Sequence, residues 1–201
     1  MAERPPFTLH CYNQGRMKRR TFVTQIISGA AALTSSARRA FAQERRYLTE
    51  EQALKLVFPS SAKIVKETKE LSDEQLQAVQ KALGVRLQSR TQTFYRGESN
   101  GATDGYAMIA TEIGKEQFIT FIVGVTKEFK IQCVALMVFR ESRGGEVADS
   151  RFTGQFRGKT VRDRFLVGSD IVGITGATLS ARAFGRGARK ALLLCEALYK
   201  K

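Results

Sequence analysis

Histidine is nearly absent from this chain of 201 residues, and its scarcity excludes several kinds of chemistry. The one histidine, His10, lies in an N-terminal segment that we expect to be removed. Without another histidine, the rest of the chain cannot form a Ser-His-Asp or Cys-His catalytic site. It also offers no histidine to ligate haem or a metal ion. We therefore expect neither a histidine-based catalytic site nor a metal centre.

Cysteine is also scarce, with three residues in the chain. Cys11 lies in the same N-terminal segment, and the spacing of Cys133 and Cys195 matches no metal-binding motif. Both stand among apolar neighbours, so we expect buried free thiols. A disulfide between them is the alternative, which an oxidising compartment would permit.

The chain has no Gly-x-Gly-x-x-Gly motif, and its expected elements do not alternate between strand and helix. Both absences argue against a dinucleotide-binding fold. A net charge of +14 raises the question of nucleic-acid binding. No nucleic-acid motif is present, however, and a protein outside the cytoplasm would not meet that target. We expect no nucleic acid among the partners.

The N-terminal segment has the order of an export signal. Basic residues 18–20 precede an apolar run over residues 22–33, and Ala40-Phe41-Ala42 follows. This basic, apolar, small-residue order predicts a signal peptide over residues 1–42. The paired arginines within the basic stretch indicate the twin-arginine export route, and hence a periplasmic location.

The apolar run is shorter than the roughly 20 residues that a bilayer requires, and polar residues interrupt it. A membrane-spanning helix is therefore disfavoured, and an uncleaved, membrane-anchored form is the alternative. Residues 1–16 match no part of an export signal, so we hypothesise that Met17 is the true start.

Positive charge concentrates toward the C-terminus. Residues 43–139 carry 13 basic and 12 acidic side chains, whereas residues 140–201 carry 13 and 6. A solvated basic face that aids solubility is the simplest interpretation. The basic half is also the half with the strongest candidate site, which is described below.

Two capping boxes predict short helices in the first part of the chain. Thr49-Glu-Glu-Gln52 opens one helix, which Pro59 ends, and Ser72-Asp-Glu-Gln75 opens another, which ends at Gly84. A short strand is expected between them, at residues 61–69. We interpret residues 43–90 as an N-terminal helical arm packed on the main domain.

Four further strands are expected at residues 85–95, 105–112, 117–125 and 130–139. The last two are apolar on both faces, which is typical of central strands. The short link at 126–130 indicates a hairpin, and therefore antiparallel pairing.

A long helix over residues 180–199 has one apolar stripe. Gly185 and Gly187 interrupt that helix, which indicates close packing against another backbone. The predicted fold class is α+β, with an antiparallel central sheet, a long C-terminal helix and the helical arm. The main domain is expected to span residues 91–201.

The strongest candidate site is the turn that leads into the last helix. It consists of Thr175, Gly176, Ala177, Thr178, Leu179 and Ser180. A helix start gathers unpaired N–H groups and the positive end of the helix dipole, so a phosphate would bind well beside Thr178. The Thr178 hydroxyl could hold that phosphate by hydrogen bonds or carry it as an ester. An ordinary helix cap by Thr178 or Ser180 is the alternative.

Two more segments are candidates for the same site. A loop with consecutive glycines contains Glu141, Ser142, Gly144 and Gly145. Such glycines let a backbone approach a planar ligand closely, although a plain hairpin turn is the alternative. The segment from Phe152 to Lys159 follows, with Gln155 and Lys159 as its candidate polar residues.

These three segments, in this order, resemble the FMN-binding domains of the periplasmic flavin-carrying subunits of Na+-translocating NADH:quinone reductase and Rnf-type complexes. The resemblance implies FMN linked by a phosphoester to Thr178 and attached by an external, Mg²⁺-dependent flavin transferase. It assigns Glu141 to Gly145 to the flavin ring or ribityl chain. One departure is Val172, because family members usually have an acidic residue six positions before the acceptor threonine.

The resemblance implies an electron-transfer flavoprotein with a membrane redox partner and a flavin transferase as partners. A carrier or redox-complex subunit fits this pattern better than a stand-alone enzyme. Two alternatives remain. One is a flavin-dependent reductase of a small oxidant, and the other is a non-redox module for anion binding or assembly.

Overall fold

The computed structural model describes residues 44–200. The predicted signal peptide, residues 1–42, lies outside these residues and stays a prediction. The strands are β1 (Arg45–Arg46), β2 (Lys63–Glu70), β3 (Thr91–Ser99), β4 (Ala102–Ile113), β5 (Phe118–Thr126) and β6 (Ile131–Phe139). The helices are α1 (Glu50–Val57), α2 (Asp73–Leu83), α3 (Ser150–Thr153) and α4 (Thr178–Tyr199), with 3₁₀ turns η1 (Gly145–Ala148) and η2 (Gly154–Phe156). No helix between residues 44 and 200 combines the length and apolarity needed to cross a membrane.

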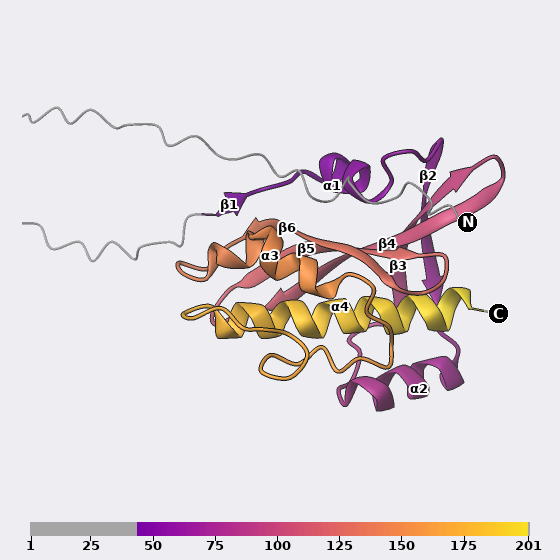
Figure 1. The fold of residues 1–201 in the computed structure, drawn as a ribbon. Helices are drawn as coiled ribbons and strands as arrows, with labels where there is room; N and C mark the ends of the chain where they lie inside the picture. Colours follow the sequence, from indigo (N-terminus) through magenta and orange to yellow (C-terminus); the bar gives the residue numbers. More distant parts are fainter. Residues whose placement is uncertain (1–43, 201) are drawn as a thin grey trace, which may run out of the picture.

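The six strands form one sheet in the order β1-β6-β5-β4-β3-β2 (Figure 1). Every neighbouring pair is antiparallel. The predicted α+β fold with an antiparallel sheet and a long C-terminal helix is therefore confirmed. Residues 43–90 contribute the two edge strands as well as two helices, and the division of the chain at residue 90 stays a prediction.

Turn residues set the strand boundaries. Asn100 and Gly101 both have positive φ, 50° and 77°, as an Asn-Gly hairpin turn requires. They place the start of β4 at Ala102, three residues before the predicted start at 105. The expected strand at 85–95 was wrong in its first half, because β3 begins at Thr91. The predicted hairpin at 126–130 is confirmed, with Thr126 donating to the Lys130 carbonyl at 2.8 Å.

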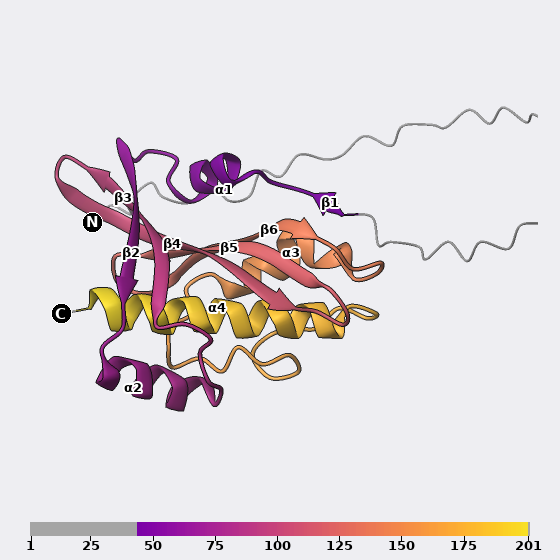
Figure 2. The same ribbon diagram turned by 180° about the vertical axis from the view of Figure 1, so that it is seen from behind.

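Both predicted capping boxes are present. The side chains of Thr49 and Ser72 accept from the backbone N–H three residues later, and Gln52 and Gln75 complete the boxes. In the two opposite views, α1 lies on one face of the sheet, α4 lies on the other, and α2 lies beyond α4 (Figures 1 and 2). The sheet is therefore covered on both faces near its centre.

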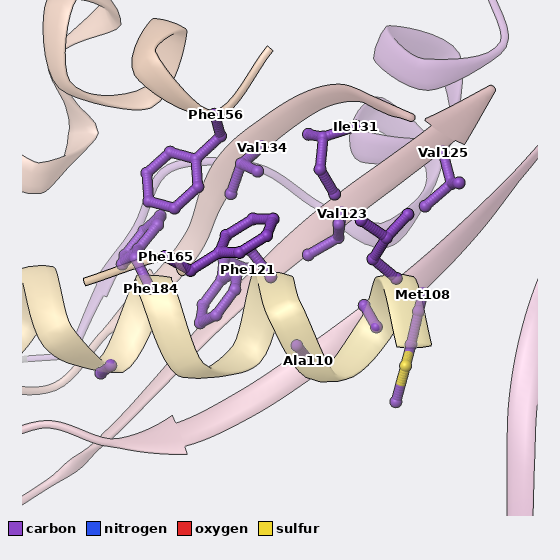
Figure 3. Packing of buried hydrophobic residues seen from close by; sticks show 14 of the residues in the cluster. Met108, Ala110, Phe121, Val123, Val125, Ile131, Val134, Phe156, Phe165 and Phe184 are labelled. Atoms are coloured by element: carbon purple, nitrogen blue, oxygen red, sulfur yellow. The ribbon is translucent and has the colours of Figure 1, made fainter. Parts of the chain in front are cut away.

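The larger core lies between the sheet and α4 (Figure 3). Phe121 of β5 stacks on Phe184 of α4, with ring centroids 4.3 Å apart. A smaller core lies under α1, around Ala53, Val57 and Ile122. The prediction that the two apolar strands are central and covered on both sides is confirmed.

The glycines of α4 allow the close approach that their positions indicate. A Cβ on Gly185 would lie 2.4 Å from the Phe165 carbonyl oxygen, and one on Gly187 would lie 2.5 Å from the Phe121 ring. Gly185 therefore packs against another backbone, as predicted, while Gly187 makes room for an aromatic side chain. These contacts fix α4, and hence its N-terminus, relative to the sheet.

Candidate functional site

The N-terminus of α4 differs from the starts of the other described α-helices, which all have a side-chain cap. The helix begins at Thr178, two residues before its predicted start, with Ala177 at the N-cap position and no side-chain cap. Its first turn contains no acidic residue, whereas α1 and α2 have capping boxes and two acidic residues each. No described residue accepts a hydrogen bond from the N–H groups of Thr178, Leu179 or Ser180. These donors and the positive end of the helix dipole are available to an anion.

The hydroxyl groups of the turn are placed differently from one another. Thr175 and Thr178 are exposed, and neither hydroxyl bonds to any residue within 44–200. Gly176 has a φ of 81° and open space around its Cβ position. Ser180 is 5% exposed and faces inward. The interpretation of Thr178 or Ser180 as an ordinary cap was therefore wrong, because neither side chain caps the helix.

The loop after β6 packs against the start of α4. Gly144 has a φ of 91°, and a Cβ there would lie 2.8 Å from the Ser180 hydroxyl oxygen and 3.4 Å from the Ala177 side chain. On the other side, Gly145 lies beside Arg45 and Tyr47. The structure thus brings the glycine loop and the Thr178 turn together. Ser142 is exposed beside them.

Glu141 has a structural contact that the sequence did not indicate. Its side chain is 6% exposed, and Oε1 accepts from the backbone N–H groups of Lys115, Glu116 (2.7 Å) and Gln117 (3.0 Å). The carboxylate therefore accepts hydrogen bonds from the three backbone N–H groups of the turn between β4 and β5, which would be costly to leave unpaired. A contact between Glu141 and a flavin stays a prediction.

Gln155 and Lys159 hold the segment that precedes the Thr178 turn. The Gln155 amide accepts from the Val172 N–H at 2.7 Å and donates to the Val172 carbonyl at 3.2 Å. Lys159 Nζ donates to Asp170 Oδ2 at 2.9 Å. Their direct contact with a cofactor stays a prediction, whereas their role in positioning this segment follows from the contacts.

Asp170 is the residue of this site that the sequence analysis missed. Its carboxylate also accepts from the backbone N–H groups of Phe165 and Leu166, at 3.0 and 2.7 Å. Partial burial raises the pKa of Asp170, but Lys159 and the two N–H groups outweigh it and lower the pKa from 3.8 to about 2. No periodic pattern marks such a residue, because its partners lie 4, 5 and 11 positions away.

We expect Asp170→Asn to destabilise the protein by about 1–2 kcal/mol at neutral pH. The pKa of Asp170 is lower in the folded protein, about 2, than in the unfolded chain, near 3.8. The ionised carboxylate therefore stabilises the fold at pH values above 3.8, and this stabilisation disappears as the pH falls toward 2. The Asp170 side chain is 24% exposed, so the free energy calculated from the whole pKa shift is an upper bound for the loss of stability. Urea unfolding at pH 7 and at pH 2.5 measures the effect. The variant should lose most of its disadvantage at the lower pH.

The matched control for this experiment is Glu146→Gln. Glu146 is an exposed carboxylate that makes no ion pair or side-chain hydrogen bond within the described residues. Its replacement should leave stability unchanged at both pH values. An equal loss of stability in the two variants would refute the special role of Asp170.

The fold and this helix start define a class of protein: an α+β domain with an uncapped glycine turn before its long C-terminal helix. The family model of the FMN-binding domain matches residues 114–193. That range begins at the turn between β4 and β5 and ends within α4, so it contains all three candidate segments. Residues 114–193 therefore match an FMN-binding domain, and FMN is the cofactor that such a domain implies.

Solved structures were also compared with this fold. The crystal structure of Shewanella oneidensis NqrC is similar, with a TM-score of 0.49 and 14% sequence identity. The similarity covers 70% of this chain and 83% of that chain. No curated protein sequence matches the chain.

Proposed function

We propose that this protein is a periplasmic electron-transfer flavoprotein that carries FMN as a phosphoester on Thr178. The observation that carries the proposal is the start of α4 within the matched FMN-binding domain. That start is uncapped and free of acidic residues, and it presents an exposed threonine hydroxyl without a hydrogen-bond partner among the described residues.

The residues of the turn fit a phosphate group. The N–H groups of Thr178, Leu179 and Ser180 have no acceptor among residues 44–200 and lie at the positive end of a 22-residue helix. Gly176 leaves open space beside them, because nothing lies within 4 Å of its Cβ position. An acidic side chain in the first turn would repel a phosphate, and α4 has none there.

Residues 44–200 provide no group in position to activate the threonine. A threonine hydroxyl is a weak nucleophile without a neighbouring base, and Thr178 has no hydrogen-bonded base among residues 44–200. An external flavin transferase must therefore form the ester. When bound, FMN supplies electron-transfer chemistry, and the protein supplies its position and electrostatic surroundings. A covalent link also prevents loss of the cofactor by dilution outside the cytoplasm.

The direct test is the intact mass of the exported protein after co-expression with a flavin transferase. We expect an increase of one FMN less one water, located in the peptide that contains Thr178. If the protein is unmodified but yellow, FMN binds non-covalently and the proposed ester is refuted. An unmodified and colourless protein would refute FMN binding.

The segment before the acceptor leads to a further prediction: Val172→Asp should raise the fraction of protein that carries FMN. The nearest natural acid, Asp170, is engaged by Lys159 and two N–H groups, so it is a poor recognition element. The Val172 side chain is 74% exposed. Gln155 holds only the backbone of Val172, so the substitution should leave the segment in place. The attached fraction is measured by intact mass after a short, limiting co-expression.

Ser169→Asp is the matched control for Val172→Asp, since Ser169 is exposed in the same segment and the change adds the same charge nine residues before Thr178. It should leave the attached fraction unchanged. If Val172→Asp also leaves the fraction unchanged under limiting transferase, the position of the acidic residue relative to Thr178 does not limit FMN attachment.

The proposed location and partner rest on the sequence. The twin-arginine pattern supports export, and the resemblance to flavin-carrying subunits supports a membrane redox partner. Cell fractionation tests the location, and replacement of the two arginines by lysines should retain the protein in the cytoplasm. Retained export after that change would exclude the twin-arginine route.

A further inference from the structure

A second candidate site lies along α4, away from Thr178. A cleft of about 560 Å³ is bounded by α4, by the ends of β3 and β4, by the link after α2 and by the segment around Phe165. Figure 1 shows α2 on the same side of the sheet as α4. The volume is within the range of small-molecule sites in proteins, about 300–1,000 Å³. The cleft could therefore hold an organic ligand.

The rim of the cleft is unusually apolar for an exposed surface. Six large hydrophobic side chains are exposed among the described residues, and four of them line this cleft. They are Val85 (58% exposed), Ile113 (45%), Phe118 (55%) and Leu166 (53%). Gathering of exposed apolar side chains at one cavity is a mark of a binding site. An apolar body would contact them favourably.

The same cleft carries an excess of positive charge. Its lining contains five basic residues and one acidic residue, Glu112. Glu112 pairs with Arg186 and Lys190. The other three, Arg86, Arg164 and Arg189, make no ion pair or side-chain hydrogen bond with any residue from 44 to 200. An anion would therefore find unpaired guanidinium groups beside an apolar surface.

Arg189 gives the most specific evidence. Its Nε is a buried side-chain nitrogen without a hydrogen-bond partner, and no other buried side-chain nitrogen or oxygen of the described residues shares that state. An unsatisfied buried donor is costly, and more so on a charged group. A planar guanidinium is well suited to bind a carboxylate through two parallel hydrogen bonds. Because Nε itself has no exposed surface, a carboxylate in the cleft would reach Arg189 through the two terminal nitrogens of its guanidinium.

We infer that this cleft binds a small organic carboxylate with an apolar body, whose carboxylate pairs with Arg189 and whose body contacts the apolar rim. The site is separate from the proposed phosphate site. Arg189 stands eleven residues beyond Thr178, which is about 16 Å along the helix axis. The inference does not depend on FMN attachment, since none of the three unpaired arginines belongs to the Thr178 turn.

The test is calorimetric titration of the full chain, produced without a flavin transferase, with dodecanoate as the probe. We expect one saturable site for dodecanoate and at least tenfold weaker binding of the neutral dodecan-1-ol. Arg189→Gln should weaken dodecanoate binding by about 10- to 100-fold, the effect of losing a charged hydrogen-bond partner. Equal binding of the acid and the alcohol would overturn the inference.

Two variants make the result specific. Arg182→Gln removes an exposed arginine of the same helix that does not line the cleft, and it should change binding by less than about twofold. Arg86 lies at the exposed rim, so Arg86→Gln should weaken dodecanoate binding without affecting folding. It replaces Arg189→Gln as the test of the cleft if that variant does not fold. Equal effects of Arg182→Gln and of the cleft variants would refute the site.

A competition experiment separates this site from the flavin site. Thr178→Val should bind dodecanoate as the unmodified chain does, and free FMN should not displace the probe. Displacement by FMN would assign the cleft to the flavin and overturn the inference. Failure of FMN attachment would leave dodecanoate binding intact, so the two proposals fail independently.

Discussion

Thr178→Val is expected to abolish covalent FMN completely while leaving the melting temperature unchanged. The substitution removes the only atom that can form the ester at this position and keeps the shape of the side chain. The hydroxyl is exposed and makes no hydrogen bond within the described residues, so the folded protein loses no internal contact. Intact mass after co-expression with the transferase measures the first effect, and thermal unfolding measures the second.

Thr175→Val is the matched control, because Thr175 is an exposed threonine in the same turn without a hydrogen-bond partner. It should retain the added mass. Covalent flavin in the Thr178→Val variant would refute the assignment of the acceptor. Loss of flavin in the Thr175→Val variant alone would move the ester to that residue.

Gly185→Ala is expected to destabilise the protein by about 3 kcal/mol, although alanine favours a helix by about 1 kcal/mol over glycine. The new Cβ would lie 2.4 Å from the carbonyl oxygen of Phe165. That oxygen belongs to the backbone, so it cannot move aside as a flexible side chain would. Urea unfolding of the two proteins measures the difference.

Phe165 has little freedom to retreat from the new methyl group. Its φ is 57°, in the left-handed region, and Asp170 accepts from its N–H group. Its ring is 3% exposed and packs toward Phe156 in the core shown in Figure 3. We therefore expect α4 to shift instead, which would also lower the fraction of FMN attached at its N-terminus.

Gly154→Ala is the control for Gly185→Ala. Gly154 has ordinary right-handed angles, φ −63° and ψ −24°, and nothing lies within 4 Å of its Cβ position. The change should be neutral or slightly stabilising, since it restricts the unfolded chain. If the two variants had equal stability, the close contact between Gly185 and Phe165 would be refuted.

The helix starts and the hairpin of this protein could be predicted from the sequence because each depends on a few neighbouring residues. The boxes at Thr49 and Ser72 place their acceptors three residues before the N–H groups that they bind, so both helix starts were predicted correctly. Residues 126–130 are too few for anything but a hairpin, which made the pairing of β5 and β6 antiparallel. The glycine turn before α4 likewise marked a helix start from sequence alone.

Predictions from local sequence were wrong where the tertiary structure opposed the preference of the residues. Val85 and Leu87 alternate with polar residues like a strand, yet they belong to the link after α2, because β3 pairs with β2 only from Thr91 onward. Thr178 and Ser180 have the side chains of helix caps, but neither caps α4. In both cases the three-dimensional surroundings outweighed the residue preference.

The sequence by itself determined the fold class and the helix start at the Thr178 turn. The tertiary structure alone decided how that turn is held. Glu141 binds a hairpin turn 24 to 26 residues earlier, and Gln155 binds the backbone 17 residues later. The packing of segments far apart in the chain leaves Arg189 Nε without a partner among the described residues. Such contacts have no period and no fixed spacing, so they exist only once the sheet and α4 have come together.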